Sequence, residues 1–370
     1  MNGPVVLAGG GTGGHVFVAR AVAEALEAQG LTAEELRFVG STRGQERDLL
    51  ADMDIELTLL PGRGLLRSLR PKAILQNLGS LVEIARAALR SFGLVRRWRP
   101  RAVVSVGGYA AAPMALAAVV FRRPLILVNV DAAPGLTHRL LGRFATASCV
   151  PISGSGLRHE VVVGIPVRAE FAGFTRNSEA QRAARGRLGL PLEGEVLGVT
   201  TGSLGARSVN QAVIGLAGDP AVGSVAIYQV SGHRDFAAVA DAQRASGRAH
   251  HVVVPFCDDM AAFYAACDLA VTRAGALSVG ELCATGTPAI LVPLPGSPGD
   301  HQTLNAQMLS EAGGGVVLTD AELTADRLGE LVAELIGTPG RLGEMSVAAR
   351  SLAHVNAAGA VAEVVLRHAR

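Results

Sequence analysis

The stretch that most constrains the fold of this chain is Val5–Leu26, VVLAGGGTGGHVFVARAVAEAL. Its apolar start, Val5–Ala8, predicts a buried strand, glycines crowd Gly9–Gly14, and apolar residues then recur at helical spacing. A strand that turns through glycines into a helix brings backbone N–H groups to a helix N-terminus, where they bind an anion or a sugar. No Gly-Lys-Ser/Thr follows, so this is not a Walker loop. A plain tight turn is the alternative, but His15 at the mouth of the turn favours a binding site.

The rest of the chain alternates apolar runs with helical patterns, which predicts parallel sheets with helices on both faces. Strands are expected at Pro4–Ala8, Arg37–Gly40, Glu56–Leu60, Ala102–Val106, Pro124–Val130, Ala147–Val150, Glu195–Thr200, Val225–Val230, His251–Pro255, Leu269–Thr272, Pro288–Pro293 and Gly315–Leu318. Helices are expected at Val16–Gln29, Gly44–Met53, Pro71–Arg97, Ala112–Val120, Ala206–Ala217, Phe236–Ala245, Met260–Cys267, Ser278–Ala284, Leu304–Ala312 and Ala358–His368. A chain of 370 residues accommodates two domains, and the join is expected near Gly164–Phe174. Where the last helix packs is not decided by these patterns.

Composition excludes several classes of protein. The cysteines Cys149, Cys257, Cys267 and Cys283 lie far apart without a C-x-x-C pair, so neither a zinc site nor a disulfide framework is expected. The formal net charge of +2 does not argue for nucleic acid, and the N-terminus lacks the pattern of a signal peptide. Apolar runs such as Ala110–Phe121 are too short to span a bilayer. We therefore expect a cytoplasmic protein without a metal or another cofactor.

Glycine and polar residues follow several further predicted strands, at the edge where ligands bind in such sheets. Gly107–Tyr109 ends one strand, and Thr201–Ala206 (TGSLGA) ends another and opens a helix, which suits a diphosphate. A plain helix cap by Ser203 is the alternative.

The stretch Thr272–Glu281 also follows a strand and opens a helix. Glu281 is expected to accept hydrogen bonds from two ribose hydroxyls, as acidic residues do in dinucleotide-binding folds. A glutamate that stabilises the helix dipole is the alternative. His301 and Gln302 begin the next helix and are expected to point to the same place. The convergence of several strand ends favours one binding site over separate structural roles.

The segment Arg63–Arg101 is rich in basic residues, and its only acid is Glu83. Apolar side chains are interleaved with the basic ones, which is typical of a segment at a membrane surface. Nucleic acid is disfavoured because only Phe92 and Trp98 could stack on bases, and a solvated helix face remains the alternative. The residues expected to contact a membrane are Leu65, Leu66, Arg67, Leu69, Arg70, Lys72, Ile74 and Leu75.

Taken together, these motifs resemble the MurG family, the N-acetylglucosaminyltransferases that act on undecaprenyl-pyrophosphoryl-N-acetylmuramoyl-pentapeptide in bacterial peptidoglycan synthesis. The matching stretches occur in order along nearly the whole chain, at Gly9–Phe17, Val106–Pro113, Pro134–Leu141, Gly164–Arg168, Thr201–Arg207, Phe256–Asp268, Arg273–Glu281 and His301–Ala306. The set is highly specific, although no single stretch is.

The resemblance implies a GT-B glycosyltransferase fold, an α/β architecture of two doubly wound, parallel-sheet (Rossmann-like) domains facing a cleft. Residues 1–165 would bind the lipid-linked acceptor and the membrane, residues 166–350 would bind UDP-N-acetylglucosamine, and residues 351–370 would cross back to the first domain. The expected location is the cytoplasmic face of the bacterial inner membrane, as a peripheral protein on an anionic surface.

The resemblance also assigns residues by position. On the acceptor side, it implies that Thr12, Gly13 and Gly14 line the site for the sugar and the acceptor. On the donor side, it implies that Arg168 and Ser203 face the phosphates and the sugar, that the backbone of Cys257 contacts uracil, and that Gln302 reaches the N-acetylglucosamine hydroxyls. The nucleotide would be framed by Ala276, Leu277, Ser278, Val279, Gly280 and Glu281, with Glu281 on the ribose. The chain departs from the family on the acceptor side. Val128–Asp131 replaces the usual His-Glu-Gln-Asn, and His138 replaces another asparagine.

The implied reaction is a single in-line displacement with inversion, in which the acceptor C4 hydroxyl attacks C1 of the donor sugar. His15 or Asp131 would take the proton, and His15 is favoured because an imidazole titrates near pH 7. Amides and the hydroxyl at Ser203 would stabilise the leaving UDP without a metal. The Asp258–Asp259 pair is not a D-x-D motif, and Asp258 is expected to cap a helix.

Three alternatives remain open from the sequence. A glycosyltransferase acting on another acceptor, such as a natural product, would share the donor half. A UDP-N-acetylglucosamine 2-epimerase would share the architecture but would need further carboxylates as acid and base. A catalytically silent protein that binds a nucleotide sugar or a lipid is the third, because of the departure at Val128–Asp131.

Overall fold

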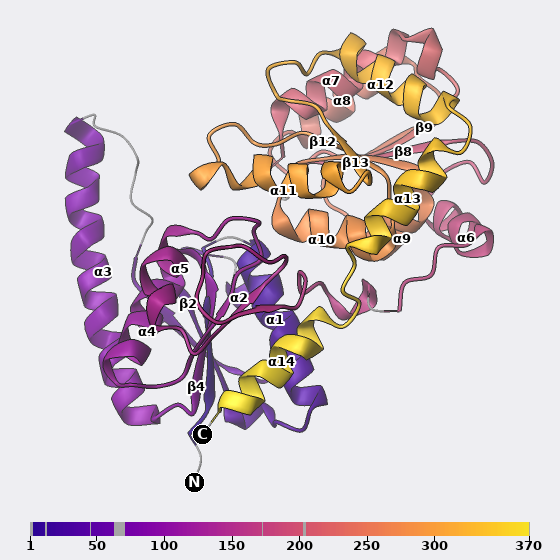
Figure 1. Cartoon of the computed structure of the whole chain (residues 1–370). Helices are drawn as coiled ribbons and strands as arrows, with labels where there is room; N and C mark the ends of the chain where they lie inside the picture. Colours follow the sequence, from indigo (N-terminus) through magenta and orange to yellow (C-terminus); the bar gives the residue numbers. More distant parts are fainter. Residues whose placement is uncertain are drawn as a thin grey trace. The chain divides into compact units, whose positions relative to one another are not determined.

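The computed structural model describes residues 3–11, 13–44, 46–62, 71–171, 173–202 and 205–369. The chain divides into two compact units, which we call unit 1 (Met1–Ala169 with Asn356–Arg370) and unit 2 (Glu170–Val355). Figure 1 labels their helices and some of their strands. Both divisions fall a few residues after the joins expected at residues 165 and 350.

Unit 1 is built, within its described residues, on a parallel sheet of seven strands in the order β3-β2-β1-β4-β5-β6-β7. The strands are β1 (Val5–Gly9), β2 (Leu36–Ser41), β3 (Glu56–Leu60), β4 (Ala102–Gly107), β5 (Leu125–Val128), β6 (Ala147–Val150) and β7 (Glu160–Val162). Every residue of β1 and β4 is buried, and the two pair with each other. Continuous apolar runs of this kind form central strands that are covered on both faces.

The helices of unit 1 lie on either side of this sheet, with α3, α4 and α5 on one side and α1 and α14 on the other (Figure 1). They are α1 (Gly13–Ala28), α2 (Glu46–Leu49), α3 (Pro71–Trp98), α4 (Gly108–Val120), α5 (Leu136–Leu141) and α14 (Ala357–His368), with 3-10 turns at Ala33–Glu35 and Gly142–Phe144. A further 3-10 turn, Ala169–Phe171, spans the division between the two units. Gln29 Nε2 on the turn after α1 donates to the carbonyl of Gly359 in α14 at 3.0 Å. The last helix therefore packs on α1, a choice that local patterns left open.

Unit 2 contains, within its described residues, a parallel sheet of six strands in the order β10-β9-β8-β11-β12-β13. The strands are β8 (Val196–Thr200), β9 (Ala226–Val230), β10 (His251–Val254), β11 (Leu269–Thr272), β12 (Ala289–Leu291) and β13 (Gly315–Val317). The helices are α6 (Ser178–Leu188), α7 (Arg207–Gly215), α8 (Phe236–Ser246), α9 (Met260–Ala266), α10 (Ala276–Thr285), α11 (His301–Glu311), α12 (Ala325–Gly337) and α13 (Arg341–Ser351), with 3-10 turns at Leu216–Gly218, Pro220–Val222 and Pro298–Asp300. Both sheets are doubly wound, as expected.

The strand order reverses once in each sheet, and this reversal locates the candidate site. In unit 1 the chain runs outward from β1 to β3 and then returns to place β4 beside β1. In unit 2 it does the same with β8 and β11. Ligands bind beyond the carboxyl ends of the strands at such a switch point. The loops after β1, β4, β8 and β11 are therefore the candidate ligand-binding loops.

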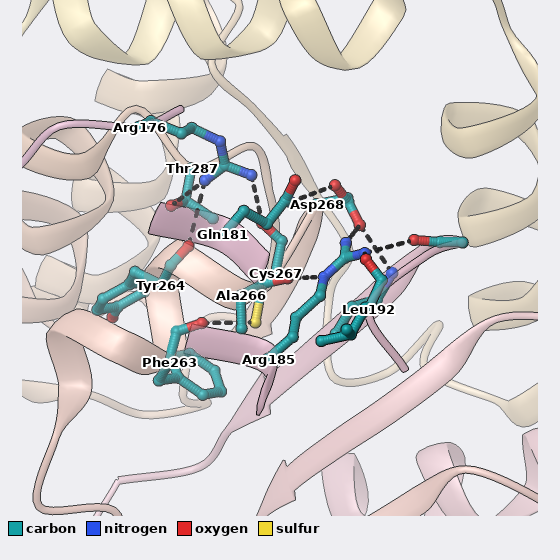
Figure 2. Close-up of polar contacts among 12 residues, drawn as sticks. Arg176, Gln181, Arg185, Leu192, Phe263, Tyr264, Ala266, Cys267, Asp268 and Thr287 are labelled. Carbon is teal, nitrogen blue, oxygen red and sulfur yellow. Dashed lines mark hydrogen bonds and ion pairs between the residues drawn. The ribbon is translucent and has the colours of Figure 1, made fainter. Parts of the chain in front are cut away.

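At the opposite, amino-terminal edge of the unit 2 sheet, α6 is anchored by an ion pair between the buried Arg185 and the partly buried Asp268 (Figure 2). Arg185 is 4% exposed, and its Nη2 lies 2.6 Å from Oδ2 of Asp268. The same guanidinium donates to the carbonyls of Ala266 at 3.1 Å and Gly194 at 2.9 Å. Asp268 also accepts from the backbone N–H of Val196 at 2.8 Å, where β8 begins. These bonds tie α6 to the sheet without involving the carboxyl edge.

Candidate active site

The carboxyl ends of β1 and β4 bring two glycine turns of unit 1 together. Gly108 has a φ of +75°, and a Cβ atom there would lie 2.6 Å from the carbonyl oxygen of Gly10. Gly107 has a φ of +97°, and a Cβ atom there would lie 3.3 Å from Nε2 of His15. Only glycine combines this backbone conformation with so close an approach. The imidazole of His15 therefore lies directly beside the second glycine turn.

A second imidazole, that of His138 on α5, also lies beside Gly107, with Cε1 3.4 Å from a Cβ atom placed there. The ring is buried, its Nδ1 lies 3.4 Å from Oδ1 of Asn129, and its Nε2 lies 3.2 Å from Oγ of Ser105. Burial first, and the nearby His15 second, lower the pKa of His138 to about 4. His138 is therefore a neutral hydrogen-bonding group at pH 7. In the sequence, His138 stood out only because it replaces an asparagine that is usual in the family.

The loop after β5 carries Asp131, the other candidate for the base. The side chain of Asn129 donates through Nδ2 to the carbonyl of Asp131 at 2.7 Å, which joins this loop to the buried imidazole network. Gly13 and Gly14 form the start of α1, and among the described atoms none lies within 4 Å of a Cβ placed at Gly14. Thr12 lies outside the described residues.

A buried carboxylate supports the first glycine turn, and the sequence analysis did not single it out. Glu46 is fully buried, and its Oε1 accepts from the backbone N–H groups of Gly11 at 3.1 Å and Ser41 at 3.0 Å. The N–H group of Gly11 is therefore already bonded within the protein. Local sequence offered no signal, because Glu46 falls in the predicted helix Gly44–Met53, where a glutamate is most often exposed.

Arg168 lies in unit 1, just before the division of the chain. Its guanidinium carbon lies 5.5 Å from the centroid of the Phe17 ring on α1. A cation over an aromatic face is attracted to the ring and packs on it. The expected domain boundary had placed Arg168 in the second domain, whereas the structure groups it with the first.

In unit 2 the turn after β8 leads into α7. Thr201 Oγ1 donates to the carbonyl of Val230 at 2.9 Å, which fixes the start of the turn against β9. Helix α7 begins at Arg207 with Ala206 as its N-cap, and no side chain of the described residues caps it. Ser203, for which the sequence left open a plain helix cap or a diphosphate contact, lies outside the described residues. The N–H groups at a helix N-terminus of this kind can bind an anion.

Glu281 lies in the second turn of α10, which begins at Ala276 and has no acidic residue in its first turn. The helix-dipole interpretation is thus not supported, because that effect falls off within the first turn. The side chain of Glu281 is 5% exposed, and its Oε2 accepts from the hydroxyl of Tyr264 at 3.0 Å. Leu277 and Ser278 are partly exposed, whereas Val279 and Gly280 are buried.

Cys257, which precedes α9, is buried, and its Sγ donates to the carbonyl of Asp259 at 3.3 Å. Burial raises the pKa of the thiol, so Cys257 is not a nucleophile at neutral pH. Asp259, not Asp258, caps α9, because its Oδ1 accepts from the N–H of Ala262 at 2.8 Å. The expectation for Asp258 was therefore wrong by one residue.

Gln302 shapes the loop before α11. The side-chain Oε1 of Gln302 accepts from the backbone N–H of Leu294 at 2.9 Å, and the backbone N–H of Gln302 donates to Oγ of Ser297 at 3.3 Å. His301 is held nearby, with Nδ1 2.8 Å from the carbonyl of Pro298. Besides the bonded oxygen, a glutamine amide carries an NH2 group that can donate to a sugar hydroxyl.

The four cysteines are all buried and free. Burial raises the pKa of Cys149 and of Cys283 to about 12, which keeps both thiols protonated and unreactive. In the described ranges, no three His, Cys, Asp or Glu side chains come together as a metal site.

Comparison with known proteins gives the same family for both halves of the chain. Residues 5–150 match the N-terminal domain of glycosyltransferase family 28, and residues 196–361 match its C-terminal domain. The chain is 40% identical to an Alkalilimnicola ehrlichii protein named UDP-N-acetylglucosamine–N-acetylmuramyl-(pentapeptide) pyrophosphoryl-undecaprenol N-acetylglucosamine transferase, with 100% of each chain covered. This chain belongs to the MurG family. A Xanthomonas euvesicatoria protein of the same name is 38% identical over 100% of this chain and 82% of its own.

Solved structures agree with membership of the MurG family. The Acinetobacter baumannii MurG structure matches with a TM-score of 0.76 and 27% identity, covering 98% of each chain. A kitacinnamycin glycosyltransferase matches at 0.71 with 15% identity, covering 100% of each chain. A Neisseria meningitidis UDP-GlcNAc 2-epimerase matches at 0.67 with 13% identity, covering 99% of this chain and 100% of its own. The last two share only the GT-B fold of two Rossmann-like domains, so they favour neither the natural-product nor the epimerase alternative.

Most of the residues expected to contact a membrane, within 65–75, lie outside the part of the chain that the structure describes. Leu65, Leu66, Arg67, Leu69 and Arg70 lie outside the described residues, and at Lys72, Ile74 and Leu75 only the course of α3 is described. Across the described part of the chain, no helix is long and apolar enough to cross a membrane.

A second basic and apolar surface, which the sequence analysis missed, lies on α5 and the turn after it. We call it the α5 surface; it comprises Leu136, Arg139, Leu140, Arg143 and Phe144, all of which are exposed. Leu136, Leu140 and Phe144 are 61%, 60% and 49% exposed. Their four-residue spacing puts them on one face of a helical run, and this spacing was a signal available in the sequence. Apolar side chains between arginines are typical of contact with an anionic membrane.

Proposed function

We propose that this protein transfers N-acetylglucosamine from UDP-N-acetylglucosamine to the C4 hydroxyl of undecaprenyl-pyrophosphoryl-N-acetylmuramoyl-pentapeptide, with inversion at the sugar carbon. The observation that carries the proposal is 40% identity, over the full length, to the Alkalilimnicola ehrlichii protein whose name states this donor and this acceptor. The glycine turns at the switch point of each sheet support it, because such edges bind phosphates and sugars.

Unit 2 is the donor half in this proposal. The departing UDP gains negative charge, which the N-terminus of α7 and the turn containing Ser203 would stabilise through N–H groups and the helix dipole. Glu281 accepts hydrogen bonds from the ribose, the backbone of Cys257 contacts uracil, and Gln302 donates to a sugar hydroxyl. Arg168 adds positive charge for the diphosphate.

Unit 1 is the acceptor half, with the glycine turn of Thr12, Gly13 and Gly14 beside the acceptor sugar. His15 accepts the proton of the C4 hydroxyl as that oxygen bonds to C1, and the C1–O bond to the diphosphate breaks with its electrons leaving on UDP. His138 does not serve as the base, because burial keeps its pKa near 4 and both ring nitrogens have protein neighbours. Asp131 is the second candidate for the base.

The acceptor is anchored in a bilayer, so the proposal includes peripheral binding to the anionic cytoplasmic face of the inner membrane. The α5 surface offers three exposed apolar side chains and two arginines on the unit that would receive the acceptor. Each basic residue near an anionic leaflet contributes about 1 kcal/mol, and burial of apolar side chains adds to it. A few such residues suffice for reversible docking.

The test is to incubate the purified protein with radiolabelled UDP-N-acetylglucosamine and the lipid-linked acceptor, and to follow label into the butanol phase. We expect transfer that requires both the pyrophosphate-linked muramoyl peptide and the N-acetylglucosamine donor, with undecaprenyl phosphate as the negative control. Formation of an N-acetylmannosamine product without acceptor would indicate a 2-epimerase. Binding of UDP without any turnover would indicate a silent binding protein, and either result would contradict the proposal.

A further inference from the structure

Tyr264 on α9 contacts the carboxylate that the proposed function assigns to the ribose. Its side chain is completely buried, and its hydroxyl donates to Oε2 of Glu281 at 3.0 Å. A tyrosine hydroxyl buried against a carboxylate makes a charge-assisted hydrogen bond, which is stronger than a neutral one. Packing alone does not require this hydroxyl, because a phenylalanine ring would fill the same space.

The ring of Tyr264 is held from two sides, so its hydroxyl has a defined position. Phe171 meets it edge-on at 6.0 Å between ring centroids, and Phe263 does so at 5.1 Å. Both phenylalanines are buried. Edge-to-face pairs of this kind favour particular ring orientations, which in turn fix the direction of the hydroxyl.

The backbone of Tyr264 is fixed as well, by Arg176 (Figure 2). Arg176 Nη1 donates to the carbonyl of Tyr264 at 3.2 Å and to Oγ1 of Thr287 at 3.2 Å, and its Nη2 donates to the carbonyl of Cys267. A guanidinium that binds three acceptors in one plane acts as a rigid brace. The end of α9 is thereby held in one place.

A second series of hydrogen bonds connects Arg176 to the main chain of Glu281. Oγ1 of Thr287 lies 2.8 Å from Oγ1 of Thr285, which donates to the carbonyl of Glu281 at 2.8 Å. Arg176 is therefore connected to Glu281 through its carboxylate, via Tyr264, and through its backbone, via the two threonines. Both ends of the residue are held before any ligand binds.

We propose that Tyr264 is a positioning residue for ribose recognition, orienting the Glu281 carboxylate so that it accepts the ribose hydroxyls of the nucleotide. A carboxylate offers about four acceptor sites, so one bond from Tyr264 is compatible with bonds from the ribose. The inference rests on the donor role proposed for Glu281. It adds that the discrimination between ribose and deoxyribose depends on a hydroxyl that never touches the ligand.

The experiment compares the dissociation constants of UDP and 2′-deoxy-UDP by isothermal titration calorimetry. The wild-type protein is expected to prefer UDP by about tenfold, the effect of one hydrogen bond to a charged group. Tyr264→Phe removes only the hydroxyl and should reduce this preference to about twofold or less. Its KM for UDP-N-acetylglucosamine should rise several-fold with kcat little changed, because the ribose lies away from the reacting carbon.

Two further variants separate positioning from general loosening of unit 2. Tyr228→Phe is the matched control, since Tyr228 is a buried tyrosine whose ring also packs on Phe263, at 6.0 Å between ring centroids, and whose hydroxyl lies near Cys257 rather than Glu281. It should keep the wild-type preference. In a Glu281→Gln background, Tyr264→Phe should change the preference no further.

The outcomes distinguish this inference from the function on which it rests. If the wild type prefers UDP and Tyr264→Phe retains that preference, the positioning role is wrong while the ribose role of Glu281 stands. If the wild type binds UDP and 2′-deoxy-UDP equally, both the ribose role of Glu281 and this inference fail. Loss of preference in Tyr228→Phe as well would also overturn it, because any buried hydroxyl would then have the same effect.

Discussion

The buried imidazole of His138 predicts a specific dependence of stability on pH. Its pKa is about 4 in the folded protein, against an ordinary value of 6.5. Below pH 6.5 the unfolded chain therefore binds a proton that the folded protein does not, so the contribution of His138 to stability is complete above pH 6.5 and is lost as the pH falls towards 4. The shift corresponds to about 3 kcal/mol in total, of which about 2 kcal/mol is lost by pH 5.

His138→Asn tests this, because asparagine keeps a hydrogen-bonding side chain in the buried site but does not titrate. The chain has one tryptophan, Trp98 at the end of α3 in unit 1, so its fluorescence during urea unfolding reports on the unit that contains His138. Between pH 7.5 and pH 5 the wild type should lose about 2 kcal/mol more unfolding free energy than the variant. Titrating groups away from His138, such as buried His251 with a pKa of about 4, are common to both proteins and cancel. Equal losses in the two proteins would show that His138 titrates like an exposed histidine and would refute the reasoning.

Three other predictions concern stability, membrane binding and catalysis. Asp268→Ala should destabilise unit 2 by about 3 kcal/mol, because Arg185 is 4% exposed and loses its carboxylate; an unchanged calorimetric transition would contradict this. Leu140→Glu should weaken sedimentation with anionic vesicles, whereas Val347→Glu, at a 72% exposed position in unit 2, should not; equal effects would remove the α5 surface from membrane contact. His15→Ala should lower kcat by about 100-fold or more with the lipid-linked acceptor, and Asp131→Asn by less; near-normal turnover in the histidine variant would exclude it as the base.

Most strands were predictable because a parallel sheet buries both faces of its central strands. Glu56–Leu60, Ala147–Val150 and Leu269–Thr272 occur with the expected bounds, and most of the other predicted strands differ by a residue or two at their ends. Apolar runs leave little freedom, since exposing them to water is costly wherever the chain turns. The glycine turns were also predictable from the sequence, because positive φ and close backbone approach restrict those positions to glycine.

Two of the helices that were not predicted, α12 and α13, include one with a clear local signal: apolar residues recur at helical spacing along α12, and Thr324 caps its start. The other missed elements depend on contacts that local pattern does not encode. Helix α6 is polar along most of its length, and it is held by the buried Arg185 together with Asp268 rather than by an apolar stripe. No element was predicted at β7 or α5, each of which is only a few residues long. Short elements contribute little periodic signal, and their stability comes from neighbours distant in sequence.

At the candidate site, the sequence by itself determined which loops matter: strand ends rich in glycine and polar residues, in an order that matches the MurG family. Only the tertiary structure decided that Glu46 lies buried beneath the first turn, that His138 is a neutral neighbour of His15, and that Tyr264 bonds to Glu281. The physical reason is that backbone conformation is restricted by the residues at each position. Whether a glutamate, histidine or tyrosine is buried, and what it bonds to, depends on side chains brought close by the folding of distant parts of the chain.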